Sequence, residues 1–183
     1  MTERRPARLF AALELPRDIV TGLAEWAAAE VGDRSELRLL APESLHVTLC
    51  FLGWRDEAEM GDIGEAVATR AAPVPSLTFH VPIWLPPRRP RVLAVDLVDG
   101  AGALAALQRS VSDALVEAAG YEPEQRDYRP HVTVARVRGS ARVRAQELAP
   151  PPAREFTGAA LTLFRSRLAR AGASYEPLVR SEL

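Results

Sequence analysis

Two short segments of the chain carry the same arrangement of reactive side chains. Each begins with a histidine, has a threonine two residues later and is otherwise aliphatic: His46-Val47-Thr48-Leu49 and His131-Val132-Thr133-Val134. In a β-strand, side chains at positions i and i+2 point to the same face, so each histidine is expected beside its threonine. Two such strands brought side by side would present two imidazoles and two hydroxyls to one cleft.

These groups suit in-line displacement at phosphorus. One neutral imidazole can take a proton from an attacking water, and one imidazolium can give a proton to the leaving oxygen. Histidine suits both roles because its unperturbed pKa of about 6.5 leaves both forms accessible near neutrality. The threonine hydroxyls can donate to the non-bridging oxygens, where negative charge must be held. A strained five-membered cyclic phosphate needs no metal ion to be opened in this way.

Each of these residues also has a structural interpretation. A lone histidine is more often a hydrogen-bonded structural residue, and threonine is common in strands because of its β-branched side chain. The occurrence of two matching tetrads favours the catalytic interpretation. His80 lies in an apolar strand without a threonine two residues later, so we interpret it as structural. With only three histidines and no HExxH sequence, a metal mechanism is disfavoured.

Apolar periodicity predicts the elements that position the tetrads. Alternation over residues 44–52 places His46, Thr48 and Cys50 on one face of a strand, with Phe51 on the opposite, core face. Helical spacing predicts helices over 16–31, 56–70 and 103–119. Further strands are expected at 8–15, 77–84, 91–98, 131–135, 161–168 and 175–179, and 142–148 is a loop or a short helix. The order indicates a similar unit twice, each with one tetrad.

Composition narrows the class of protein. The 183 residues are 48% hydrophobic, enough for the core of one domain or of two small lobes. The formal net charge of −1 disfavours a protein that holds a long duplex, so any nucleic-acid contact should be small. Cys50 is the only cysteine, which excludes an intramolecular disulfide and a thiolate metal cage. No apolar stretch is long enough for a membrane span, and a cytoplasmic location is expected.

The residues that flank the tetrads resemble those of a known family. The likeness runs nearly end to end and includes Arg8-Leu9-Phe10, Leu15-Pro16, Leu45 before the first tetrad, Phe51-Leu52-Gly53, Pro130, Ala135-Arg136, Ser166, Gly172 and Tyr175. In these positions the chain resembles the two-histidine (2H) phosphoesterases, and specifically their RNA 2′,3′-cyclic phosphodiesterase branch, also called 2′-5′ RNA ligases. One tetrad alone would be a weak signal, whereas two in this order with these flanks are a strong one.

The resemblance implies a fold, a reaction and partners. The fold is a single bilobal α+β domain over 1–183, in which two antiparallel sheets line a central cleft and helices cover their outer faces. The reaction is hydrolysis of a 2′,3′-cyclic phosphate to a 2′-phosphate, with a weak 2′-5′ ligation in reverse in some members. The expected partners are RNA 3′ ends or nucleotides bearing the cyclic phosphate. No cofactor, metal or membrane is implied, and a monomer is expected.

The resemblance also implies roles for individual residues. His131 is expected to act as the base toward water and His46 as the acid toward the leaving 3′ oxygen, although the opposite assignment stays open. Thr48 and Thr133 complete the catalytic set. Arg136 matches the family's arginine after the second tetrad and is expected to bind phosphate. Phe51 falls where an aromatic residue follows the first tetrad and is a candidate substrate contact, despite its expected core-facing side. Cys50 replaces a small alanine and would narrow the cleft.

Two other functions remain open from the sequence. The same chemistry could act on a small nucleotide metabolite instead of RNA. Alternatively, the cleft could be a non-catalytic module that binds a nucleotide or an RNA end, although a binder needs no pair of proton-transferring groups. The arginines at 88, 89 and 91 are either an RNA contact or a solvated turn. Trp26 and Trp84 are expected to pack in the core or at its rim instead of stacking on a base.

Overall fold

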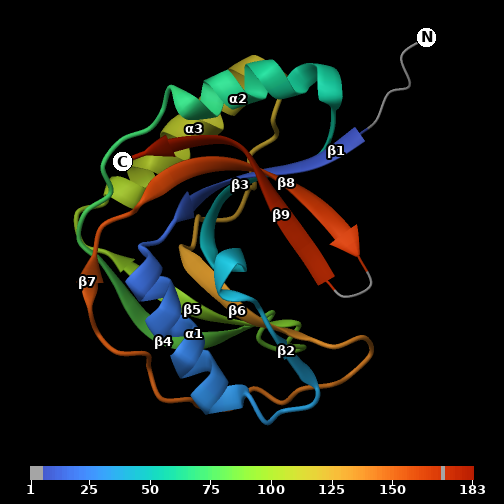
Figure 1. Ribbon diagram of the computed structural model, residues 1–183, viewed down its shortest axis with the longest axis vertical. Helices are drawn as coiled ribbons and strands as arrows, with labels where there is room; N and C mark the ends of the chain where they lie inside the picture. Colours follow the sequence, from blue (N-terminus) through green and yellow to red (C-terminus); the bar gives the residue numbers. More distant parts are fainter. Residues whose placement is uncertain (1–5, 170–171) are drawn as a thin grey trace.

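The chain folds as one long curled sheet with helices against it, as expected for an α+β protein (Figure 1). The computed structural model describes residues 6–169 and 172–183. The α-helices are α1 (Arg17–Val31), α2 (Met60–Ala68) and α3 (Ala103–Ala119), with 3₁₀ turns η1 (Pro42–Ser44) and η2 (Glu57–Glu59). The strands are β1 (Pro6–Glu14), β2 (Leu37–Leu39), β3 (His46–Asp56), β4 (Leu77–Leu85), β5 (Val92–Asp99), β6 (His131–Val137), β7 (Glu155–Phe156), β8 (Ala160–Ala169) and β9 (Gly172–Glu182).

The sheet has two halves that meet at the two tetrad strands. Its strand order is β7-β4-β5-β6-β3-β1-β8-β9, with β2 paired to the edge of β6. Strands β3 and β6 pair in antiparallel orientation at Val47 and Val132. The expected two antiparallel sheets are therefore the two halves of one continuous sheet, joined where the tetrads lie. All the strand pairings among the described residues are antiparallel.

The helices cover the outer side of each half. In Figure 1, α2 and α3 lie together beside the β8 and β9 half, and α1 lies against the other half. Contacts agree with this view, since α2 packs on α3, β8 and β9, and α1 packs on β6 and β2. The apolar stripe of α1 that faces the core includes Ile19, Leu23 and Trp26. Each half thus has one face buried under helices and one face left for the cleft.

Two sequence signals fix the ends of these elements. Gly120 ends α3 with a positive φ of 56°, a left-handed conformation that glycine adopts without a steric penalty. Asp56 caps η2, because its side chain accepts from the N–H of Ala58 while Glu59 bonds back to the N–H of Asp56. The predicted helix over 56–70 is therefore a capped 3₁₀ turn followed by α2.

No helix in 6–169 or 172–183 combines the length and apolarity that a membrane crossing requires.

Some elements follow from tertiary contacts alone. The short strands β2 and β7 were not predicted, because segments of three and two residues are too short to show the alternation of apolar and polar side chains. The segment 142–148 is a loop, and two tryptophans hold the irregular chain at its end. The indole N–H of Trp84 donates to the carbonyl of Gln146 at 2.9 Å, and that of Trp26 donates to Ala149 at 3.1 Å. Both rings are buried, which confirms their assignment to the core.

A β-bulge occurs at the same place in both tetrad strands. Along β3, Thr48 lies opposite Ala12 and Cys50 opposite Ala11, so that Leu49 is an extra residue. Along β6, Thr133 lies opposite Ala94 and Ala135 opposite Leu93, so that Val134 is extra. A bulge of this kind reverses the alternation of side chains beyond it. The residues directly after each tetrad therefore face the opposite way from a regular strand, until a second bulge at Leu52 of β3 restores the alternation for Trp54.

Candidate active site

One small pocket gathers the chemistry of both tetrads. Its volume is about 40 Å³, and its lining consists of Leu40, Ser44, His46, Thr48, His131, Thr133, Arg136 and Tyr175. Four of these are the catalytic residues predicted from sequence, and Arg136 is one of the two predicted substrate contacts. A pocket this small and this polar suits a phosphate group better than a nucleobase. Larger hollows on the surface are open and contain none of the four tetrad residues.

The register between the two strands explains why the four groups converge. Val47 pairs with Val132 in antiparallel orientation. Counting outward from this pair, His46 is level with Thr133, and Thr48 is level with His131. The arrangement is nearly twofold, and it gives each histidine a threonine from the other strand as a neighbour as well as its own.

The bulges correct two expectations about the residues after the first tetrad. Phe51 was expected on the core side, yet it is 41% exposed and lies opposite Phe10 on the cleft face. Cys50 was expected in the cleft, yet it is buried in the main core beside Leu49. The extra residue at Leu49 reverses the alternation, which strict strand parity could not anticipate. Burial raises the pKa of the Cys50 thiol to about 12, so it is an inert core residue.

Arg136 occupies the position in β6 that corresponds to Phe51 in β3. Each follows the histidine of its own tetrad by five residues, and each reaches the cleft face because a bulge lies between it and that histidine. An arginine here places a permanent positive charge at the wall of the phosphate-sized pocket. The two substrate contacts expected from sequence therefore lie at equivalent points of the two halves.

His46 is enclosed by aromatic rings. Its imidazole stacks on Phe10 with centroids 4.9 Å apart, and the ring of Tyr175 meets it edge-on at 5.2 Å. Burial lowers the pKa of His46 to about 4, a hydrogen bond to the backbone of Ser44 opposes this, and the positive charges of Arg136 and His131 lower it further. In the free protein at neutral pH, this imidazole is therefore uncharged.

The low pKa of His46 predicts a specific loss of stability in acid. An unfolded histidine takes up a proton near pH 6.5, whereas folded His46 does so only near pH 4. The folding free energy contributed by neutral His46 is present above pH 6.5 and falls as the pH drops through 4, by up to about 3 kcal/mol. Urea unfolding at pH 7 and pH 4 should show that His46→Gln loses less stability than the wild type. Equal losses in the two proteins would contradict this environment.

His131 is held by a backbone hydrogen bond next to an ion pair. Its Nδ1 lies 2.8 Å from the carbonyl oxygen of Arg129, which can only accept, so Nδ1 carries the hydrogen and Nε2 is left for the pocket. The guanidinium of Arg129 donates to both carboxylate oxygens of Asp96, with its Nε 2.9 Å from Oδ1. Asp96 lies opposite His131 in the β5 and β6 pairing. This ion pair therefore ties Arg129, whose carbonyl orients the imidazole, to β5.

We expect Asp96→Asn to act through His131. Loss of the carboxylate charge of Asp96 should loosen Arg129 and its carbonyl and so misplace Nε2 of His131. We expect kcat to fall by roughly ten-fold with little change in KM. The measurement is steady-state kinetics on a nucleoside 2′,3′-cyclic phosphate. In a His131→Ala background the same substitution should have no further effect. An equal loss in that background would show that Asp96 acts elsewhere.

Several pocket residues were not among the predicted site residues. Tyr175 was noted only as part of the family resemblance, yet it lines the pocket and packs on His46. Leu40 and Ser44 come from the segment before β3 and carry no motif, so the sequence offered no signal for them. Gly172 has a φ of 133°, and a Cβ there would collide with the guanidinium of Arg38. Of the resembling tail residues, Tyr175 lines the pocket, whereas Ser166 and Gly172 are not part of its lining.

Other residues considered from sequence lie outside the pocket. His80 is exposed on β4 and is not part of the lining, so the structure gives it no buried structural role. Arg89 and Arg91 border a separate open hollow with Gly139 and Ser140. Within the described part of the chain, no group of three or more His, Cys, Asp or Glu side chains is arranged to hold a metal ion.

Comparison with known proteins agrees with this geometry. A family model described as the 2′-5′ RNA ligase superfamily matches residues 15–170, most of the chain. This protein belongs to that superfamily. A relative from Aeropyrum pernix, named RNA 2′,3′-cyclic phosphodiesterase, is 28% identical over 152 residues, covering 78% of this chain and 84% of its own. An Escherichia coli protein of the same name is 27% identical over 178 residues and 96% of each chain.

Solved structures share this fold. A crystal structure of a Thermus thermophilus protein superposes with a TM-score of 0.81 at 25% identity, covering 96% of this chain and 97% of its own. Escherichia coli LigT in its apo form gives a TM-score of 0.81 at 24% identity and covers 97% and 98%. The expected membership of the 2H phosphoesterases and the α+β fold with helices outside the sheet are both confirmed.

Proposed function

We propose that this protein hydrolyses RNA 2′,3′-cyclic phosphate ends to 2′-phosphomonoesters without a metal ion. The observation that carries the proposal is the pocket itself, in which two histidines, two threonines and Arg136 meet from two strands that are far apart in the sequence and adjacent in the sheet. Two curated relatives named RNA 2′,3′-cyclic phosphodiesterase support the same reaction. Because each half of the sheet supplies one histidine and one threonine, we treat 1–183 as one catalytic unit.

The reaction divides between the two histidines. His131 Nε2 takes a proton from water as the water oxygen bonds to phosphorus, and the bond from phosphorus to the 3′ oxygen breaks. His46 gives its proton to that 3′ oxygen, leaving a 2′-phosphate and a 3′-hydroxyl. Thr48, Thr133 and Arg136 hold the non-bridging oxygens as charge develops on them. Exchange of protons with solvent then restores both histidines.

The low pKa of His46 in the free protein sets a condition on this assignment. The cyclic phosphate carries one negative charge, and its arrival beside Arg136 and both imidazoles favours protonation of His46. The acid is thus charged mainly when substrate is bound. If the 5′-hydroxyl of an RNA replaced water, the same groups would form a 2′-5′ linkage, the reverse ligation expected of some family members.

The test is a product assay in EDTA. Purified protein is incubated with adenosine 2′,3′-cyclic phosphate and with a short RNA ending in a 2′,3′-cyclic phosphate, and the products are separated by chromatography. We expect the 2′-phosphate from both substrates at the rate seen without EDTA. Formation of the 3′-phosphate, loss of activity in EDTA, or binding without turnover would each contradict the proposal, and the last would favour the non-catalytic module.

A further inference from the structure

A surface of aromatic and basic side chains continues from the pocket along the cleft face. It consists of Arg8, Phe51 and Trp54, which we call the outer patch. Trp54 is 63% exposed and Phe51 is 41% exposed. The other large apolar side chains that are exposed in the described residues are valines, spread over β4, β5 and α3. Among these exposed apolar side chains of the described residues, the aromatic rings are therefore confined to β3, the strand that carries the first tetrad.

The register places the outer patch in line with the catalytic groups. On β1, Ala12 lies opposite Thr48, Phe10 opposite Phe51 and Arg8 opposite Trp54, because Leu52 is a second extra residue in β3. Residues 8, 10 and 12 alternate onto one face, so these three pairs are successive steps of about 7 Å leading away from the pocket. The guanidinium of Arg8 lies over the ring of Phe51, 4.5 Å from its centroid. A strand of nucleic acid leaving the pocket along this face would meet Phe51 and then Trp54.

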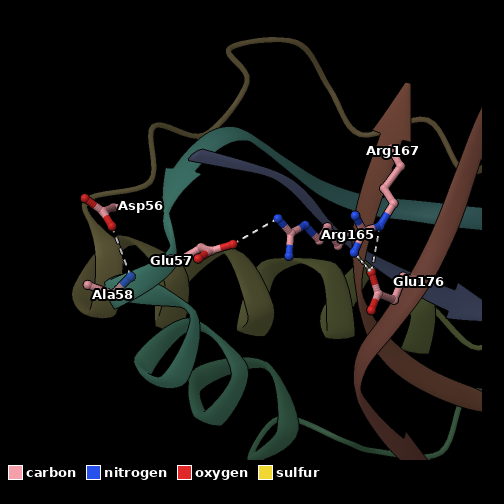
Figure 2. A network of polar contacts seen from close by, with 6 residues as sticks. All are labelled: Asp56, Glu57, Ala58, Arg165, Arg167 and Glu176. Atoms are coloured by element: carbon pink, nitrogen blue, oxygen red, sulfur yellow. Dashed lines mark hydrogen bonds and ion pairs between the residues drawn. The ribbon is translucent and has the colours of Figure 1, made fainter. Parts of the chain in front are cut away.

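Polar contacts hold the end of β3 that carries the outer patch. Figure 2 shows the polar network beyond Trp54, in which Asp56 caps η2 and Glu57 pairs with Arg165 of β8 at 2.9 Å. Arg167 pairs with Glu176 across the β8 and β9 hairpin. Arg55 adds a hydrogen bond from its guanidinium to the carbonyl of Ala119 at 3.0 Å. The contacts of Arg55, Asp56 and Glu57 hold the chain next to Trp54 although its indole is exposed, which suits a preformed binding surface.

The chemistry of the patch matches single-stranded RNA. Aromatic faces stack on any base, and an arginine binds phosphate and stacks on rings. Arg8 donates to Ser166 Oγ at 3.4 Å, and it forms no ion pair with any described residue. Resting on the proposed function, we propose that Arg8, Phe51 and Trp54 form a subsite for the nucleotide that precedes the cyclic-phosphate end. The protein would therefore favour RNA ends over free cyclic nucleotides.

The test compares two substrates in each variant. The readout is the ratio of kcat/KM on a trinucleotide ending in a 2′,3′-cyclic phosphate to kcat/KM on adenosine 2′,3′-cyclic phosphate. Trp54→Ala should lower this ratio by about ten-fold, because one stacked base is lost, whereas Trp54→Phe should keep most of it. Val116→Ala, which shortens an exposed apolar side chain on α3, should leave the ratio unchanged.

Salt dependence tests the role of Arg8 separately. Binding of a fluorescent trinucleotide 2′-phosphate is measured by anisotropy over a range of salt concentrations. Arg8→Gln should reduce the slope of log affinity against log salt by about 0.7, the value for one phosphate contact on a single strand. An unchanged slope would remove Arg8 from the subsite.

The outcomes separate this proposal from the proposed function. Hydrolysis of both substrates with a ratio that Trp54→Ala does not change would overturn the subsite and leave the phosphodiesterase intact. Failure of the wild type to hydrolyse either substrate would overturn the function itself. A wild type that prefers the mononucleotide would also count against the subsite and would favour the metabolite substrate.

Discussion

Replacing either His46 or His131 by alanine should lower kcat on a nucleoside 2′,3′-cyclic phosphate by about 10²- to 10⁴-fold. Each substitution removes one of the two proton transfers, at water or at the leaving oxygen. Because the two transfers belong to one step, the double variant should be little slower than the slower single variant. Initial rates measured over at least four orders of magnitude in enzyme concentration check this.

The third histidine provides the matched control for these variants. His80 is exposed on β4 and lies outside the pocket lining, so His80→Ala should retain wild-type kcat. Thermal melting at pH 7 should confirm that all three variants fold. Retention of more than a tenth of wild-type activity by a folded His46→Ala or His131→Ala variant would contradict the shared pocket as the catalytic centre.

Thr48→Val and Thr133→Val should each lower kcat by about 10- to 10³-fold. Valine keeps the β-branched shape that the strand favours and removes only the hydroxyl, so the change isolates one donor to the phosphate oxygens. If the donors act mainly on charge that develops during the reaction, kcat should fall more than KM rises. Steady-state kinetics on the cyclic nucleotide at pH 7 measures both constants.

A threonine in another strand controls for the loss of a hydroxyl. Thr78 lies in β4, outside the pocket lining, and Thr78→Val should leave both constants unchanged. The two pocket variants should also resemble one another, since Thr48 and Thr133 occupy equivalent places around the Val47 and Val132 pair. A loss confined to KM would indicate that the hydroxyls bind the substrate without stabilising the reaction.

Sequence alone located the candidate catalytic residues that meet in the pocket because their signal is local. A histidine and a threonine two residues apart share a face in any strand, and this spacing survives in both tetrads. The three helices follow equally from apolar periodicity, and the end of α3 coincides with Gly120. The convergence of the two tetrads needed a second argument, the repeated order of elements, since the residues that meet are far apart in the chain.

The features that sequence missed arise from contacts between distant segments. Strict alternation turned Phe51 inward and Cys50 outward, and the bulge at Leu49 reversed both. The spacing of apolar residues in a strand does not predict where a bulge occurs. The low pKa of His46 likewise depends on Phe10 and Tyr175, which approach it from β1 and β9. Burial by such remote rings cannot be read from the tetrad itself.

The division of labour between the histidines is tested most directly with a substrate whose bridging 3′ oxygen is replaced by sulfur. A thiolate leaves without being protonated, so the variant that lacks the acid should recover on this substrate. Activity of the variants relative to wild type is compared on the oxygen and sulfur substrates. The structure and the proposed roles predict that His46→Ala recovers by at least ten-fold and His131→Ala does not. Recovery of His131→Ala alone, of both variants, or of neither would contradict the assignment of His131 as base and His46 as acid.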